Sequence, residues 1–113
     1  DKVKEATKTI RKKNKDIIAD GEVQFDTAYV PEISKKKCKI DILKGSANVF
    51  IFPDLNSGNI GYKMVQRLGK YKAIGPVVQG LKKPINDLSR GCNVNDVVEL
   101  SIITAMQAID SKK

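Results

Sequence analysis

The chain has 113 residues and carries 21 lysines and arginines against 13 aspartates and glutamates, a net charge of +8. This length suits one domain with a modest core, and 41% hydrophobic against 30% charged residues is typical of a globular rather than a disordered protein. The chain has no histidine, which excludes histidine-based catalysis within it. Its two distant cysteines offer no set of zinc ligands, so we expect no metal site.

The basic charge comes almost entirely from lysines spread along the chain, and only three of these residues are arginines. Aromatic residues are few and tryptophan is absent, so surfaces for base stacking are poorly supplied. We therefore interpret the lysines as a solvated surface rather than a nucleic-acid site. No apolar run approaches the ~20 residues of a membrane span, and no signal-peptide core is present at the N-terminal end. The sequence predicts a cytoplasmic protein with reduced thiols that binds neither nucleic acid nor membranes.

The first part of the chain predicts two helices with a short strand between them. Apolar residues recur at helical spacing among lysines over residues 2–14, which predicts a helix. Residues 17–19 are apolar and predict a short buried strand. We expect residues 27–38 to be helical with exposed lysines, and residues 38–46 to form a lysine-rich loop.

The second part of the chain predicts strands that alternate with helices. The continuous apolar run at 49–52 is typical of a parallel strand covered on both faces, and Pro53 ends it. Residues 56–69 predict a loop and then a helix, residues 73–81 a second short strand, and residues 93–110 a terminal helix with one apolar face inward. This alternation predicts an α/β layered fold with parallel pairing.

The first candidate site is the junction between the predicted strand at 49–52 and the helix that follows it. Gly58 and Gly61 permit a backbone or a ligand to approach closely. Three nearby side chains offer hydrogen-bond donors to a substrate: Asn59, Tyr62 and Lys63. The alternative is structural, with a side chain at 56–57 capping the helix and the glycines serving the turn.

The second candidate site is the polar stretch at 84–96, PINDLSRGCNVND. Asn93 is a good N-cap and Asp96 follows at the third helical position, so the pair resembles a capping box. Ser89 and Arg90 precede the cap, where a guanidinium can bind phosphate or carboxylate oxygens bidentately. Without a histidine partner Ser89 suits a positioning role better than a nucleophilic one. Asp96 is either a helix cap alone or also free for chemistry.

Three segments in the same order resemble the C-terminal part of the phosphate acetyltransferase family: residues 18–34, 47–69 and 73–109. The resemblance covers essentially the whole chain. The motifs GNIGYK and NDLSRG favour the acetyltransferase branch. Two relatives remain as alternatives, the phosphate butyryltransferases and the acetyl-CoA- or acetyl phosphate-sensing domain that is fused to malic enzymes and lacks catalysis.

The resemblance implies a three-layer α/β/α fold with a mostly parallel sheet, similar to isocitrate and isopropylmalate dehydrogenases, of which this chain is the C-terminal part. Members of that fold have two α/β domains with the active site in the cleft between them. The resemblance assigns residues 1–82 to the second domain. It assigns residues 83–113 to a crossover loop and a C-terminal helix that returns to the first domain.

The family's reaction is reversible acetyl transfer between acetyl phosphate and coenzyme A. By resemblance, Asp96 is the base that takes the thiol proton, Ser89 orients the thiol or the acyl group, and Arg90 binds the phosphoryl group. The substrate contacts expected at the first junction are Asn59, Tyr62 and Lys63. The resemblance also implies a homodimeric full-length enzyme with coenzyme A as a substrate and no tightly bound cofactor. We expect the 113 residues alone to be inactive.

Overall fold

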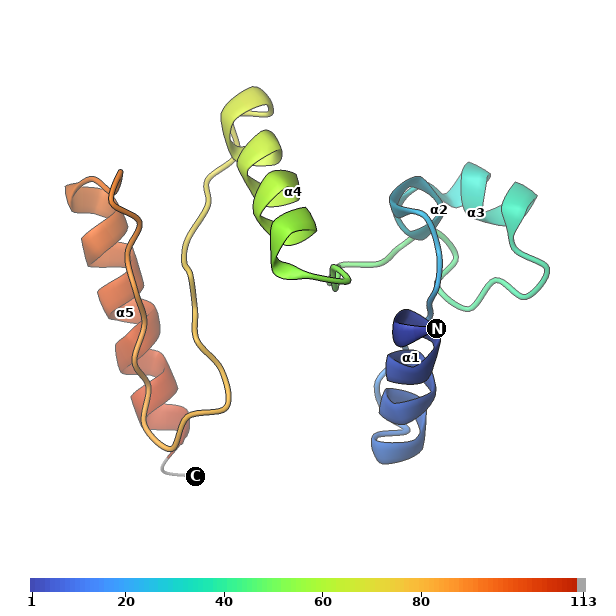
Figure 1. Cartoon of the computed structure of the whole chain (residues 1–113), viewed down its shortest axis with the longest axis horizontal. Helices are drawn as coiled ribbons and strands as arrows, with labels where there is room; N and C mark the ends of the chain where they lie inside the picture. The colour runs from blue at the N-terminus through green and yellow to red at the C-terminus, as the bar shows by residue number, and fades with distance from the viewer. Residues whose placement is uncertain (112–113) are drawn as a thin grey trace. The chain divides into compact units, whose positions relative to one another are not determined.

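The computed structural model describes residues 1–111, and within that range it contains five α-helices and no β-strand (Figure 1). The helices are α1 (Lys2–Lys13), α2 (Phe25–Tyr29), α3 (Pro31–Lys37), α4 (Leu55–Leu68) and α5 (Val94–Asp110). The chain divides into two compact units, Asp1–Gly61 and Tyr62–Lys113. No helix in residues 1–111 combines the length and the apolar character that crossing a membrane requires.

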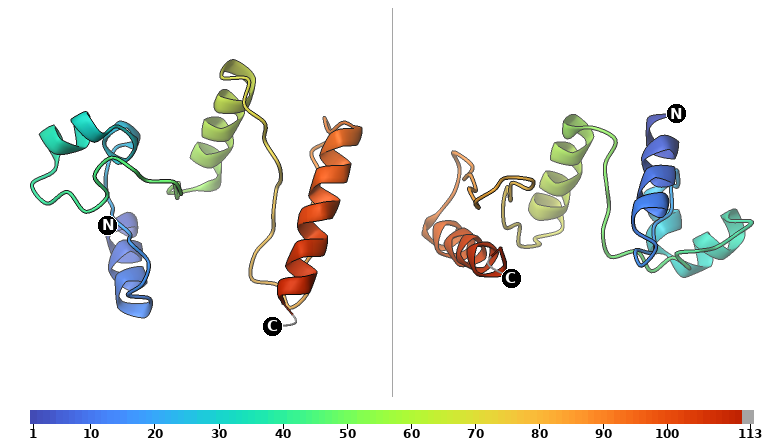
Figure 2. Two further views of the ribbon diagram at one scale, coloured as in Figure 1. Left: turned by 180° about the vertical axis from the view of Figure 1, so that it is seen from behind. Right: turned by 90° about the horizontal axis from the view of Figure 1, so that it is seen from below.

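The predicted parallel sheet is absent from residues 1–111, and the three segments expected to be strands run as plain chain (Figure 2). A strand forms only where a neighbouring strand takes up its backbone N–H and C=O groups, and the segments at 17–19, 49–52 and 73–81 have no such partner here. Ile18, expected in a buried strand, is 75% exposed. The prediction of a three-layer α/β/α fold like that of isocitrate and isopropylmalate dehydrogenases is therefore wrong for this structure.

The helices follow the sequence pattern more closely. α1 and α5 agree with the predictions at 2–14 and 93–110 to within a residue at each end. Gly69 lies directly after α4, and its N–H donates to the carbonyl of Val65 at 3.0 Å. The single helix predicted at 27–38 is instead two, because Pro31 disfavours helical backbone at Val30, which is extended (φ −110°, ψ 112°).

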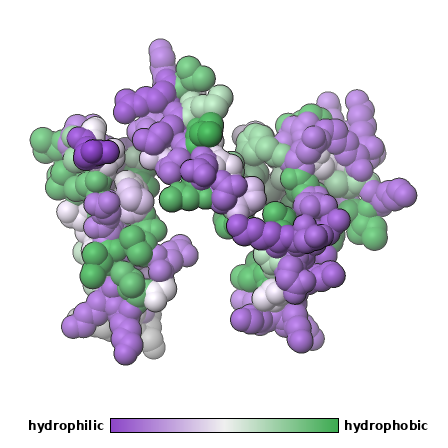
Figure 3. All heavy atoms as spheres, in the orientation of Figure 1, coloured by the Kyte–Doolittle hydropathy of each residue, from purple (hydrophilic) through white to green (hydrophobic). Residues whose placement is uncertain are grey.

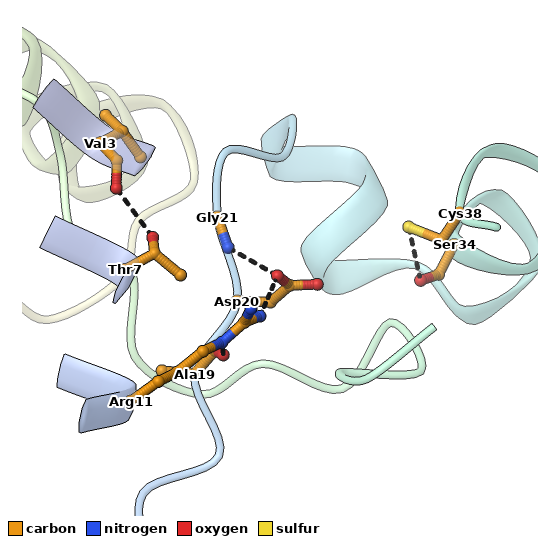
Figure 4. Close-up of polar contacts among 8 residues, drawn as sticks. All are labelled: Val3, Thr7, Arg11, Ala19, Asp20, Gly21, Ser34 and Cys38. Atoms are coloured by element: carbon orange, nitrogen blue, oxygen red, sulfur yellow. Dashed lines mark hydrogen bonds and ion pairs between the residues drawn. The ribbon is translucent and has the colours of Figure 1, made fainter. Parts of the chain in front are cut away.

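Polar contacts hold the first unit together. On α1, the Arg11 Nε donates to the carbonyl of Ala19 at 2.9 Å, and its Nη2 pairs with the Asp20 carboxylate at 2.5 Å (Figure 4). Lys37 of α3 donates to the carboxylate of Asp26 in α2 at 3.0 Å, which lowers the pKa of that carboxyl. The buried hydroxyl of Ser34 donates to a carboxylate oxygen of Asp41 at 2.7 Å.

Little apolar surface is buried among the described residues. Ala28 of α2 and Leu100 of α5 are the buried hydrophobic residues there, at 6% and 4% exposure. The apolar face of α5 that the pattern placed inward is exposed instead, with Val94 at 78%, and Figure 3 shows hydrophobic residues on the surface. The helical period therefore identified an apolar face correctly, but nothing in residues 1–111 covers it.

Candidate functional site

The residues before α5 form a tight turn that presents Ser89 and Arg90. The N–H of Cys92 donates to the carbonyl of Ser89 at 2.9 Å, and the N–H of Gly91 lies 3.3 Å from the Ser89 Oγ. Both Ser89 and Arg90 are exposed. The turn thus places a hydroxyl and a guanidinium at the surface just before the helix begins.

A capping box begins α5, as the sequence predicted. The Asp96 N–H donates to the Asn93 Oδ1 at 3.1 Å, and the Asn93 N–H donates to the Asp96 Oδ2 at 2.8 Å. The Asp96 carboxylate is therefore held by one of its oxygens. Its other oxygen, Oδ1, accepts no hydrogen bond from residues 1–111. Asp96 caps the helix and still has an acceptor oxygen available.

The guanidinium of Arg90 forms no ion pair or hydrogen bond within residues 1–111. Arg11 differs, since Ala19 and Asp20 occupy its guanidinium. An exposed guanidinium without a carboxylate partner retains all its donors for an anionic ligand, in the planar geometry that suits phosphate and carboxylate oxygens. Arg90 is thus chemically suited to the anion-binding role expected from its sequence context.

The start of α4 has a different cap from those considered in the sequence. The Asp54 Oδ1 accepts the Ser57 N–H at 2.9 Å, so Asp54 is the N-cap and neither Asn56 nor Ser57 fills that role. The Ser57 N–H, followed by the Ser57 hydroxyl, holds the pKa of the Asp54 carboxyl below its ordinary value. The helix starts at Leu55, so the loop predicted at the beginning of residues 56–69 is already helical.

The two glycines of this junction face an aromatic ring. A Cβ at Gly61 would lie 2.7 Å from the Cζ of Phe52, and a Cβ at Gly58 would lie 3.7 Å from the Phe52 Cβ. The close approach that the glycines were expected to permit is therefore made by the Phe52 side chain. Gly61 is sterically required for this contact, whereas Gly58 has room for a methyl group.

The three candidate substrate contacts all lie within α4 rather than on a loop. Their spacing of i, i+3 and i+4 places Asn59, Tyr62 and Lys63 on one face of the helix. The Lys63 Nζ lies 5.5 Å from the centroid of the Tyr62 ring, a cation–π distance. Between residues 62 and 111, no hydrogen bond or ion pair joins Tyr62 or Lys63 to the turn or the capping box. Within the second unit, the structure therefore brings Ser89, Arg90 and Asp96 to one end of α5 and bonds neither Tyr62 nor Lys63 to them.

One residue of the second unit that the sequence did not single out connects three parts of the chain. The Asn86 Oδ1 accepts the Val78 N–H at 2.8 Å. Its Nδ2 donates to the Thr104 Oγ1 at 2.8 Å and to the Gln107 Oε1 at 2.7 Å, both on α5. An ion pair between Lys72 and Glu99 makes a second connection to this helix. No local pattern identifies Asn86, because its partners lie 8, 18 and 21 residues away in sequence.

An open groove of about 640 Å³ lies between this part of the chain and α5. Its walls are the residues around Asn86 on one side and the helix face of Leu100, Ser101 and Thr104 on the other.

Both cysteines, Cys38 and Cys92, are free thiols. No cluster of three or more cysteine, aspartate or glutamate side chains within residues 1–111 is arranged to hold a metal ion.

The comparisons with known proteins agree with the family resemblance of the sequence. The model of a family described as phosphate acetyl/butaryl transferase matches residues 1–105. The chain is 53% identical over 109 residues to the phosphate acetyltransferase of Bacillus subtilis (strain 168), and 56% identical over 112 residues to that of Staphylococcus aureus (strain Mu50 / ATCC 700699). Each alignment covers 96% of this chain and 34% of the relative.

A solved structure, the EutD phosphotransacetylase from Staphylococcus aureus, is similar to this chain with a TM-score of 0.80 and 56% identity. The alignment covers 94% of this chain and 32% of the solved chain. The chain thus spans about a third of the length of the relatives it matches. Because the family model matches nearly all of its residues, the chain belongs to the phosphate acetyl/butaryl transferase family.

Proposed function

We propose that the full-length protein containing this chain transfers an acetyl group reversibly between acetyl phosphate and coenzyme A. Family membership and relatives named phosphate acetyltransferase at 53–56% identity support this function. The observation that carries it is the start of α5, where an exposed hydroxyl, an unpaired guanidinium and a carboxylate with an available oxygen lie within eight positions, from Ser89 to Asp96.

In the direction of acetyl-CoA formation, the thiol of coenzyme A gives its proton to the Asp96 carboxylate. The thiolate sulfur then attacks the acetyl carbonyl carbon, a C–S bond forms, and the C–O bond to phosphate breaks. The electron pair of the C–O bond leaves with the phosphate. In this proposal the proton goes to the Asp96 Oδ1, because that oxygen accepts no hydrogen bond from residues 1–111.

Ser89 and Arg90 act on the acyl phosphate in this proposal. The guanidinium of Arg90 binds the phosphoryl oxygens bidentately and stabilises the negative charge that grows on the departing phosphate. The Ser89 hydroxyl donates to the thiol or the acyl oxygen and aligns the two substrates. The remaining substrate contacts come from the polar face of α4: Asn59, Tyr62 and Lys63.

Turnover of the full-length protein with acetyl phosphate and coenzyme A tests the function, followed by the appearance of the thioester. We expect acetyl-CoA to form, and Arg90→Ala to lower kcat by about 10² or more, since it removes a charge that acts at the transition state. Arg67→Ala is the control, because Arg67 is an exposed arginine of α4 whose loss changes the net charge equally.

Two outcomes would count against the proposal. Faster turnover of butyryl phosphate than of acetyl phosphate would indicate that the protein is a butyryltransferase, the other activity in the name of the family. Equal rates for Arg90→Ala, Arg67→Ala and the unaltered protein would remove Arg90 from the mechanism. The 113 residues alone, which we expect to be inactive, provide the background rate.

A further inference from the structure

We propose that Asn86 is a positioning residue, which keeps Ser89 and Arg90 at a fixed position relative to the Asp96 carboxylate. The proposal rests on the function proposed above and adds a residue that touches no substrate. It starts from the three hydrogen bonds of the Asn86 amide, at 2.7–2.8 Å, to the Val78 N–H and to the Thr104 and Gln107 side chains.

The orientation of the Asn86 amide is fixed by what its partners can offer. Thr104 donates its hydroxyl proton to the carbonyl of Leu100 at 2.7 Å, so its oxygen can only accept from Asn86. The Val78 N–H can only donate. The position therefore requires one acceptor atom and two donor hydrogens on a short side chain. Asparagine meets that requirement, whereas aspartate keeps the acceptor and loses both donors.

The hydrogen bonds of Asn86 hold one end of the segment that carries the candidate catalytic residues, and the capping box holds the other. Residues 87–92 run from Asn86, bonded to Thr104, back to Asn93 at the start of α5. Thr104 lies about 15 Å further along the helix than Val94, at about 1.5 Å per residue. Both ends of the segment are thus attached to the same rigid helix. The distance between these two attachment points limits where the turn with Ser89 and Arg90 can lie.

The consequence for catalysis is geometric. Without Asn86, the segment keeps its attachment at Asn93 but loses the one at Thr104 and Gln107, and the turn at Ser89 can shift relative to Asp96. A misplacement of about 1 Å between reacting groups can cost as much as 10² in rate. Asn86 therefore acts through the residues it positions, and its loss should matter only while they are present.

The experiment is a double-mutant cycle in the full-length protein, with kcat and the thermal midpoint measured for each variant. We expect Asn86→Ala to lower kcat by about 10-fold to 10²-fold. In a background that carries both Ser89→Ala and Arg90→Ala the same change should lower kcat by less than about threefold, because neither of the residues that Asn86 positions is then present. Gln79→Ala is the control, since Gln79 is an exposed amide of the same unit with no side-chain hydrogen bond to residues 1–111, and its kcat should be unchanged.

Each result decides the proposal. Unchanged kcat in Asn86→Ala overturns it, and so does an equal loss in both backgrounds, which would indicate a general loss of folded enzyme. If the unaltered protein makes no acetyl-CoA, the proposed function fails and this inference falls with it. Turnover by the unaltered protein together with either of the first two results overturns the inference alone.

A second pair of variants decides the matter if Asn86→Ala does not fold. Thr104→Val keeps the shape of the side chain and removes the acceptor, whereas Thr104→Ser keeps the hydroxyl. We expect the valine variant to lose several-fold in kcat and the serine variant to match the unaltered protein. Equal rates for the two variants would overturn the proposal.

Discussion

The starts of α4 and α5 are built from the same parts, and they leave different groups available. Each helix begins at a side-chain cap. At α4 the cap is the charged Asp54, whose Oδ1 accepts both the Ser57 N–H and the Ser57 hydroxyl. At α5 the cap is the neutral Asn93, and the carboxylate of Asp96 lies one turn further along.

This difference determines what a ligand can meet at each helix. The N-terminus of a helix attracts anions through its free N–H groups and its dipole, and a carboxylate at the N-cap already satisfies that attraction. The Phe52 ring also lies against α4, closest at Gly61, seven positions after the cap. At α5 the residues before the cap are the exposed Ser89 and Arg90. The side-chain cap of α4 therefore serves only to begin the helix, whereas the cap of α5 lies beside polar groups that a ligand can reach.

Exchanging carboxylate for amide at the two helix starts should separate them most strongly. We expect Asp96→Asn to lower kcat of the full-length protein by about 10²–10⁴, because the amide can still accept the Asn93 N–H but cannot take a proton. Asp54→Asn removes a charge at the start of α4, at the N-cap rather than at the third helical position, and should leave kcat unchanged. Steady-state turnover of both variants is the measurement, and equal losses would contradict a catalytic difference between the two helices.

The contact between the Phe52 ring and α4 leads to a second prediction, with a smaller expected effect. Gly61→Ala places a methyl group 2.7 Å from the Phe52 ring, and overpacking of this kind costs about 1–3 kcal/mol. Gly58→Ala meets only ordinary contacts and should gain up to about 1 kcal/mol from helix propensity. Gly61→Ala gains the same helix propensity but must displace the Phe52 ring, so Gly58→Ala should have the higher thermal midpoint of the two variants. A higher midpoint for Gly61→Ala would contradict the steric role of the Phe52 ring.

The helices and the α5 cap could be predicted from the sequence because they depend on neighbours along the chain. The apolar period predicted α1 and α5, and an asparagine three residues before an aspartate predicted the capping box. Ser89, Arg90 and Asp96 share one end of α5 for the same reason, since few residues separate them. Local spacing was enough to place them.

What the sequence could not provide depends on distant partners. The apolar run at 49–52 has the composition of a buried strand, but a strand needs a neighbour, and in residues 1–111 this segment has none. The role of Gly61 depends on a ring nine positions earlier, and the role of Asn86 on side chains 18 and 21 positions later. Residue types and local periods do not encode such contacts.

The smallest expected effect is the acid sensitivity of the carboxylate cap of α4. Hydrogen bonds from Ser57 lower the pKa of the Asp54 carboxyl in the folded state, so the folded protein binds fewer protons there than the unfolded chain. The resulting stability is complete above the carboxyl's ordinary pKa of 3.8 and is lost as the pH falls through the lower folded value. The Asn93 amide at α5 does not titrate. The thermal midpoint of the unaltered protein should exceed that of Asp54→Asn at pH 6, and the difference should shrink below pH 4, whereas a difference independent of pH would mean that the Asp54 charge does not stabilise the start of α4.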